Sequence, residues 1–405
     1  MTKTDSKMER RSFIKMGLGG LAGLSAAPAL TGGNGTEVHA VSDQGRKMIY
    51  RTLGKTGLRL PIVSMGVMNA DNPSLVAAAL DAGIIMLDTA WGYQRGRNEE
   101  MIGKVIKGRP RDSFVLATKV PGDRERKTGY LLPDADPKNF TEKFDQSLER
   151  LGLEYVDIFY LHNLKRGQDA QYEPLVKALV NEKKRGRAKF IGVTSHSGEP
   201  EVIKAAVETG VYDVVLTAYN FRKDYVDELD EAIALAAKAG MGVVAMKTQA
   251  GAFWDKEKTD PINMSAALKW ALKNPNIHTA IPGFTTFDQI ELDLSIMEDL
   301  TLTDQEIKDL RMEQKTGGLY CQQCDACLAQ CPQQLPIPEL MRGYMYAFGY
   351  KNLEKAHTLV ASLDLPEDPC GKCSVCSVRC AKAFDVKDRV TNISRMRNIP
   401  ADFFA

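Results

Sequence analysis

Short apolar runs alternate with amphipathic stretches from Met48 to about Leu300. The runs are apolar throughout, which is typical of strands buried on both faces of a parallel sheet. They occupy Ile62–Val67, Ile84–Asp88, Phe114–Lys119, Val156–His162, Phe190–Thr194, Val214–Asn220, Val243–Lys247 and Thr279–Pro282. Helical periodicity is found between them at Asn139–Leu151, Tyr172–Lys184, Val226–Ala239 and Asn263–Lys273. Eight βα units within about 250 residues predict a (β/α)8 TIM barrel over residues 48–300.

The alternative fold is a doubly wound open sheet, but no G-x-G-x-x-G follows an early strand. Polar residues instead stand at or just past the ends of several predicted strands: Asp88, Lys119, His162 and Asn220. In a barrel the carboxyl ends of the strands converge on one face, where active sites are built. We therefore expect these four side chains to meet.

The pattern changes after Leu300. Residues 301–319 are predicted to form a helical linker, in which Thr303 caps a helix over Thr303–Glu313 and Glu306 completes a capping box. Beyond it, Ile337–Phe348 and Leu353–Leu363 are helix-like. All eight cysteines lie in this last part of the chain.

The cysteines form two motifs with the same spacing, C-x2-C-x2-C-x3-C. They are Cys321, Cys324, Cys327 and Cys331, and then Cys370, Cys373, Cys376 and Cys380. Such a run is typical of iron–sulfur proteins, in which three thiolates bind one cluster and the fourth reaches the other. Eight thiolates would hold two [4Fe–4S] clusters, and the helix-like spacer resembles an α-helical ferredoxin domain over residues 320–395. Four disulfides or two zinc sites are the alternatives.

The N-terminus has the features of an export signal. Basic residues, including Arg10 and Arg11, precede the apolar stretch Met16–Leu30, which rises only about 22 Å as a helix and is too short to span a bilayer. Val38-His39-Ala40 offers a cleavage site. The string Arg10-Arg11-Ser12-Phe13-Ile14-Lys15 resembles the twin-arginine motif, so residues 1–40 are interpreted as a signal for export to the periplasm or another extracytoplasmic space.

Composition narrows the class of partner. Lys and Arg number 53 against 52 Asp and Glu, so the chain lacks the basic excess of a nucleic-acid-binding protein. We expect no nucleic-acid partner and no membrane span in the mature chain.

Several barrel segments resemble the aldo-keto reductase family. They are Leu87-Asp88-Thr89-Ala90-Trp91-Gly92-Tyr93, Asn98-Glu99-x2-Ile102-Gly103, Ala117-Thr118-Lys119, Leu161-His162-Asn163, Ile191–Ser195 and Ala280-Ile281-Pro282-Gly283. The resemblance covers about residues 48–300, and the cysteine motifs point to members with a ferredoxin-like C-terminal extension. It implies an oxidoreductase that interconverts a small carbonyl compound and an alcohol.

By this resemblance Asp88, Tyr93, Lys119 and His162 form the catalytic tetrad. A free tyrosine has a pKa of about 10 and exchanges protons poorly at neutral pH. Lys119 is expected to lower the pKa of Tyr93, and Asp88 to hold Lys119 charged. His162 would orient the carbonyl. The alternative roles are a structural Asp88–Lys119 ion pair and a core histidine.

The resemblance also implies a nicotinamide dinucleotide, NADP or NAD. The matching positions are Ser195, His196, Met246, Gly283, Gln289 and Asp293. Several depart from the family pattern: Leu216 replaces a glutamine, and Gly283, Phe284 and Gln289 replace residues that often bind the 2′-phosphate of NADP. Nothing resembles a flavin motif.

The sequence thus predicts an exported oxidoreductase in which a catalytic barrel is coupled to, or accompanied by, an electron-transfer domain, with a redox protein as a possible partner. Two other functions stay open. The barrel could be a non-catalytic scaffold in an iron–sulfur electron-transfer protein, or the clusters could only stabilise the fold.

Overall fold

The computed structural model describes residues 47–312 and 319–404. The predicted export signal, residues 1–40, lies outside the described residues.

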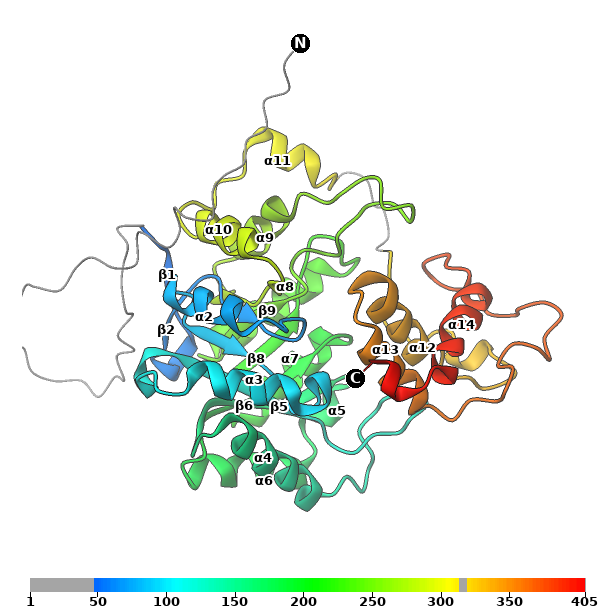
Figure 1. Ribbon diagram of the computed structural model, residues 1–405, viewed down its shortest axis with the longest axis horizontal. Coiled ribbons are helices and arrows are strands. Elements are labelled where there is room, and N and C mark those ends of the chain that lie inside the picture. Colours follow the sequence, from blue (N-terminus) through cyan, green and yellow to red (C-terminus); the bar gives the residue numbers. More distant parts are fainter. Residues whose placement is uncertain (1–46, 313–318, 405) are drawn as a thin grey trace, which may run out of the picture. The chain divides into compact units, whose positions relative to one another are not determined.

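A parallel eight-stranded sheet forms the centre of the barrel (Figure 1). Its strands are β3 (Met65–Gly66), β4 (Met86–Asp88), β5 (Val115–Val120), β6 (Val156–Leu164), β7 (Ala188–Ser195), β8 (Val214–Ala218), β9 (Gly242–Met246) and β10 (Thr279–Ala280). Each strand pairs with the next along the chain. The parallel bridges Val63–Ala280 and Gly66–Gly283 join the first strand to the last. The sheet therefore closes on itself as the predicted (β/α)8 barrel, and the open sheet is excluded.

Helices follow the strands and cover the outside of the barrel. They are α2 (Pro73–Asp81), α3 (Arg97–Ile106), α4 (Pro137–Leu151), α5 (Gly167–Ala170), α6 (Glu173–Lys184), α7 (Glu199–Thr209), α8 (Val226–Lys238), α9 (Met264–Lys273) and α10 (Phe287–Ile296). Outward strand residues pack on them: Phe159 of β6 stacks on Phe140 and Phe144 of α4, with ring centroids 5.3 and 3.8 Å away.

A hairpin that the sequence pattern did not predict closes the N-terminal end of the barrel. Its strands are β1 (Tyr50–Thr52) and β2 (Arg59–Pro61), which pair antiparallel. Leu53, Leu58 and Leu60 are fully buried with the inward residues of the barrel strands. The interior is therefore a packed core, and only its other end is available for a site.

The C-terminal part is helical. After α11 (Asp304–Asp309) it contains α12 (Ile337–Tyr344), the π-helical turn Met345–Gly349, α13 (Leu353–Ala361) and α14 (Val386–Ser394). Short 3₁₀ turns complete the structure at Gly54–Thr56, Tyr93–Gly96, Arg111–Ser113, Leu328–Gln330, Arg395–Asn398 and Ala401–Phe404. The capping box of α11 is present, because Glu306 N donates to Thr303 Oγ1 at 3.1 Å and Thr303 N donates to the Glu306 carboxylate at 2.8 Å.

The C-terminal helices share a core of their own, to which Leu340, Val360 and Ile393 contribute. The helices approach closely at Gly343, where an added Cβ would lie 2.9 Å from Val360 Cγ2. Within the described residues, every helix is too short or too polar to cross a lipid bilayer.

Candidate active site

Strand alternation brings the polar strand-end residues to one place. Val115 and Ala117 of β5 point into the barrel interior, and Lys119 follows in the same row. Asp88 continues the row of Met86, and His162 continues that of Tyr160. Because side chains alternate with a period of two, each polar residue caps an inward apolar row at the carboxyl end of the barrel.

Asp88, Lys119 and Tyr93 form one hydrogen-bonded chain. Lys119 Nζ donates to Asp88 Oδ1 at 2.6 Å, to Thr89 O at 2.5 Å and to the Tyr93 hydroxyl at 3.3 Å. The Asp88 and Lys119 residues are each only 1% exposed. Tyr93 stands in a 3₁₀ turn directly after β4, which brings its hydroxyl over the strand ends.

The pKa of Tyr93 in this hydrogen-bonded group differs from the one that the sequence predicted. Burial raises the pKa of Tyr93, and the opposing effect of Lys119 does not overcome it. The predicted lowering of this pKa is therefore wrong in its net direction, because a phenolate loses hydration when it is buried. Burial also acts against the charge of Lys119, but Asp88 and Tyr93 outweigh it and raise the pKa of Lys119.

His162 completes the group of four. Its ring centroid lies 6.2 Å from that of Tyr93, in an edge-on arrangement. Burial, followed by the charges of Lys119 and Arg124, holds the pKa of His162 well below its ordinary value. The imidazole is therefore neutral at pH 7 and keeps one N–H that can donate to a ligand.

A cavity of about 710 Å³ opens above these residues. Among the predicted site residues, Asp88, Tyr93, His162, His196, Met246, Gly283, Gln289 and Asp293 line it. This volume is in the range of pockets that bind organic ligands and cofactors. The structure thus brings most of the predicted catalytic and dinucleotide residues to one space.

Three residues predicted to bind the dinucleotide are buried or already hydrogen-bonded within the protein. Ser195 is fully buried, and its hydroxyl lies 3.0 Å from Leu164 O and 2.7 Å from Ser197 O, to either of which it can donate, so it does not face the cavity. Gln289 accepts from Thr285 N at 2.7 Å, at the N-terminus of α10. Asp293 is buried, and burial raises its pKa to about 8, so it is mostly protonated at pH 7.

Sequence reasoning missed the contribution of the C-terminal helices. Tyr346, of the π-helical turn, and Lys355, of α13, line the same cavity. Lys355 Nζ lies 4.7 Å from the ring centroid of Tyr93 and 5.2 Å from that of Tyr346. No local pattern could indicate this, because Lys355 follows the helical periodicity of a segment far from Tyr93 in sequence.

Buried ion pairs join the C-terminal helices to the barrel. Lys165 Nζ, after β6, donates to Glu339 Oε1 of α12 at 2.9 Å, and Glu339 also pairs with Arg342. Arg124, in the loop after β5, donates to the backbone oxygens of His162 and Asn163 and so holds the backbone at His162 in place.

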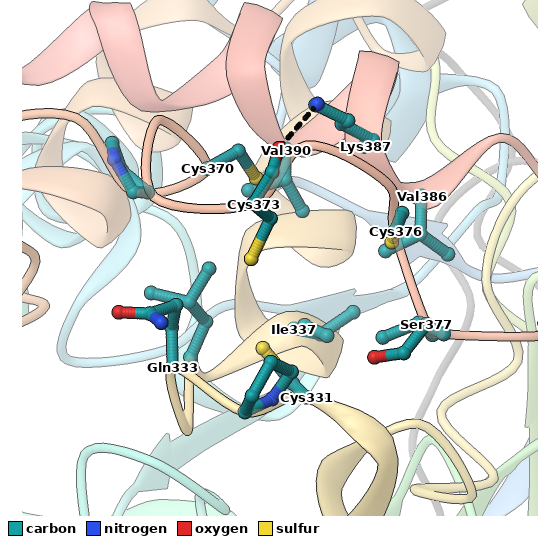
Figure 2. Close-up of a pocket in the computed structure, with 14 residues that line it drawn as sticks. Cys331, Gln333, Ile337, Cys370, Cys373, Cys376, Ser377, Val386, Lys387 and Val390 are labelled. Atoms are coloured by element: carbon teal, nitrogen blue, oxygen red, sulfur yellow. Dashed lines mark hydrogen bonds between the residues drawn. The ribbon is translucent and has the colours of Figure 1, made fainter.

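One group of cysteines combines both motifs. Cys331 of the first motif lines a small cavity with Cys370, Cys373 and Cys376 of the second. Figure 2 shows the sulfur atoms of Cys331 and Cys373 directed toward one another across this space. Three thiols from one motif and the fourth from the other are the arrangement that the iron–sulfur pattern predicts.

In residues 47–312 and 319–404 no group of three or more His, Cys, Asp or Glu side chains is arranged to hold a single metal ion, and none of the eight cysteines forms a disulfide. Each cysteine of a cubane cluster binds a different iron, so the donors of a cluster are spread around its volume. Four thiols that line one cavity fit such a group. Burial raises the pKa of Cys321 to about 11, so it stays a thiol at neutral pH unless a metal replaces its proton.

The first motif lies next to the candidate active site. Tyr320 and Cys321 line the 710 Å³ cavity together with Tyr93 and His162. A group bound by Cys321 would therefore border the space in which a substrate or cofactor binds.

Comparison with known proteins identifies the barrel. The model of the aldo/keto reductase family matches residues 64–267, half of the chain. L-Glyceraldehyde 3-phosphate reductase of Escherichia coli K12 is 34% identical over 166 residues, which are 38% of this chain and 47% of that protein. The chain therefore spans about half the length of this relative. L-Galactose dehydrogenase of Arabidopsis thaliana is 27% identical over 311 residues, which cover 67% of this chain and 92% of that protein.

Solved structures give the same result. The holo form of an aldo-keto reductase from Bacillus halodurans superposes with a TM-score of 0.53 and 25% identity. It covers 65% of this chain and 96% of its own, so the match leaves about a third of this chain outside it.

Proposed function

Because the chain belongs to the aldo/keto reductase family and is an oxidoreductase, we propose that it interconverts a small carbonyl compound and an alcohol, with Tyr93 as the general acid and base. The hydrogen-bonded chain Asp88–Lys119–Tyr93, which borders the 710 Å³ cavity, carries this proposal.

Reduction of a carbonyl needs one proton at oxygen as hydride reaches carbon. The Tyr93 hydroxyl supplies this proton, and the Lys119 ammonium beside it stabilises the phenolate that forms. The raised pKa of Tyr93 keeps the phenol protonated until the substrate oxygen gains negative charge. Neutral His162 donates an N–H to the same oxygen and orients it.

A nicotinamide dinucleotide supplies or accepts the hydride when bound. His196 and Met246 would hold its nicotinamide end near Tyr93, and Gly283, Gln289 and Asp293 the other end. Lys247 lies in the same cavity and offers a cation for phosphate; burial, followed by the charge of Lys223, lowers its pKa to about 8.

We propose further that the cysteines hold two [4Fe–4S] clusters. One set is Cys370, Cys373 and Cys376 with Cys331, and the other is Cys321, Cys324 and Cys327 with Cys380. Each cluster would pass one electron at a time to a redox partner, whereas the dinucleotide would exchange the two electrons of the carbonyl–alcohol conversion as hydride. Cys321 borders the cavity, which would couple the clusters to the barrel or to a redox partner protein.

Tyr93→Phe tests the catalytic proposal. The variant keeps the ring but removes the proton donor, so we expect kcat to fall by about 10²–10⁴-fold. Tyr172→Phe is the control, because its hydroxyl bonds to the Pro133 carbonyl away from the cavity. Full turnover by Tyr93→Phe would overturn the assignment.

The surroundings of two residues favour a second function, in which the barrel is a non-catalytic scaffold. Ser195 is turned away from the cavity, and Leu216 is packed in the barrel interior. Both weaken the nicotinamide site, as expected if the barrel is a scaffold for an electron-transfer protein.

Anaerobic titration of the cluster-loaded protein with NADH and NADPH separates the two functions. Dinucleotide binding is followed by fluorescence and the clusters by electron paramagnetic resonance. Binding with cluster reduction supports a single electron path. If neither dinucleotide binds, the scaffold function is favoured.

We also propose export by the twin-arginine route, on the basis of Arg10 and Arg11, the apolar stretch Met16–Leu30 and the cleavage site Val38-His39-Ala40 in the sequence. Replacing both by lysine should retain the chain inside cells that carry this pathway. Equal export of the two forms would contradict the proposal.

A further inference from the structure

Lys355 brings an additional cation to the reacting group of the proposed enzyme. Its Nζ lies over the Tyr93 ring at 4.7 Å, and the second aromatic ring beside it belongs to Tyr346, at 5.2 Å. Both rings and Lys355 line the cavity. An ammonium held between two rings above the proton donor therefore faces the space where a substrate would bind.

The carboxylates near Lys355 form ion pairs with other cations. Glu354, next in the chain, pairs with Arg97 at 2.6 Å and with Arg95 at 3.4 Å. Glu339 pairs with Lys165 and Arg342, and Asp88 pairs with Lys119. No ion pair of Lys355 with a carboxylate is found in the described part of the chain.

The surroundings of Lys355 are instead cationic. Burial, followed by the charges of Arg342 and Lys119, lowers the pKa of Lys355 to about 7, and the opposing charge of Glu354 does not overcome them. Cation–π contacts are worth about 0.5–2 kcal/mol each and do not replace a counter-ion. A positive charge kept at this place is strained electrostatically, and an anion in the cavity would relieve the strain.

We propose that Lys355 binds an anionic group of the substrate, a carboxylate or a phosphate, while the carbonyl of that substrate faces Tyr93. This inference rests on the proposed function and makes the C-terminal helices part of the substrate site. The enzyme then prefers charged aldehydes, ketones or hydroxy acids over neutral ones of the same size.

Matched substrates test the preference. Succinate semialdehyde is compared with butyraldehyde, and glyceraldehyde 3-phosphate with glyceraldehyde, in the cluster-loaded protein with saturating dinucleotide. The readout is the ratio of kcat/KM for the charged compound to that for its neutral partner. A larger ratio for the succinate semialdehyde pair indicates a carboxylate site, and a larger ratio for the glyceraldehyde 3-phosphate pair indicates a phosphate site.

Lys355→Gln should lower this ratio by about 10–100-fold, because a hydrogen bond to a charged group is lost. Lys355→Arg keeps the charge and should retain most of the ratio. Lys177→Gln, on the exposed side of α6, is the control and should leave it unchanged. An unchanged ratio in Lys355→Gln, or a loss confined to dinucleotide affinity, would overturn the proposal.

Calorimetry with succinate, which does not react, separates this inference from the proposed function. If the wild-type protein turns over none of the four aldehydes, the proposed function fails but the anion site can still be measured. Succinate binding that is lost in Lys355→Gln and kept in Lys355→Arg supports the site. Equal succinate binding by wild type and Lys355→Gln refutes it.

Discussion

Replacing Glu339 by glutamine tests whether the buried ion pairs hold the C-terminal helices on the barrel. The Glu339 carboxylate accepts from Lys165 Nζ at 2.9 Å, and these side chains are 3% and 1% exposed. Burial opposes the ionisation of Glu339, but Arg342 and Lys165 together outweigh it and hold its pKa below the usual value. Glutamine keeps the shape and removes the charge, so buried Lys165 and partly buried Arg342 lose their counter-ion.

The expected magnitude follows from the geometry. Two unit charges 2.9 Å apart attract by about 6 kcal/mol at an effective dielectric constant of about 20. Removing one partner of a buried pair costs about 3–5 kcal/mol, because the other charge stays buried. Glu173→Gln is the matched control: its pair with Lys177 is 72% and 69% exposed and should contribute under about 1 kcal/mol.

Hydrogen–deuterium exchange gives the assay, read on α12 (Ile337–Tyr344). A loss of 3–5 kcal/mol should speed exchange there by about 10²–10⁴-fold relative to wild type. The pKa of Glu339 is depressed, so its contribution is present at neutral pH and is lost only as the pH falls below the ordinary range of a glutamate and through the depressed pKa. If Glu339→Gln exchanges as slowly as Glu173→Gln at pH 7, this reasoning is refuted.

Three further predictions concern the site. In Asp88→Asn the ammonium of Lys119 loses its carboxylate, so kcat should fall by about 10²-fold or more in steady-state assays; a loss under tenfold would contradict this. Burial raises the pKa of Asp293 to about 8, so the folded protein keeps a proton that the unfolded chain releases above about pH 4. The free energy of unfolding should therefore fall as the pH rises from about 4 to about 8, and Asp293→Asn should flatten this slope in urea titrations. Cys331→Ser should halve the bound iron while the cluster of Cys321 persists; loss of all iron would contradict separate sites.

Much of the barrel could be predicted because its signals are local. An apolar run between two amphipathic stretches specifies a buried strand wherever it occurs, and each of the eight runs contains or overlaps a strand of the structure. The sequence also placed Asp88, Lys119 and His162 at the ends of predicted strands, and the alternation of side chains in the structure directs them into the barrel. The hairpin β1–β2 was missed because its strands are only three residues long, too short for a periodic signal.

The site was predicted only in part, because its electrostatics depend on burial. The residue types of Asp88, Tyr93 and Lys119 are visible in the sequence, but the net direction of the Tyr93 pKa depends on how much water the fold removes. Ser195 matched a cofactor position, yet its hydroxyl bonds to the carbonyl oxygens of Leu164 and Ser197 instead of facing the cavity.

The sequence by itself thus determined the eight βα units, the polar residues at the strand ends and the spacing of the cysteines, because each depends on neighbours within a few positions. Only the tertiary structure decided that Lys355 lies over Tyr93, that Cys331 joins the second cysteine motif, and that Lys165 meets Glu339 from 174 positions away. Such contacts carry no periodic signal, since the packing of whole helices on the barrel brings them together.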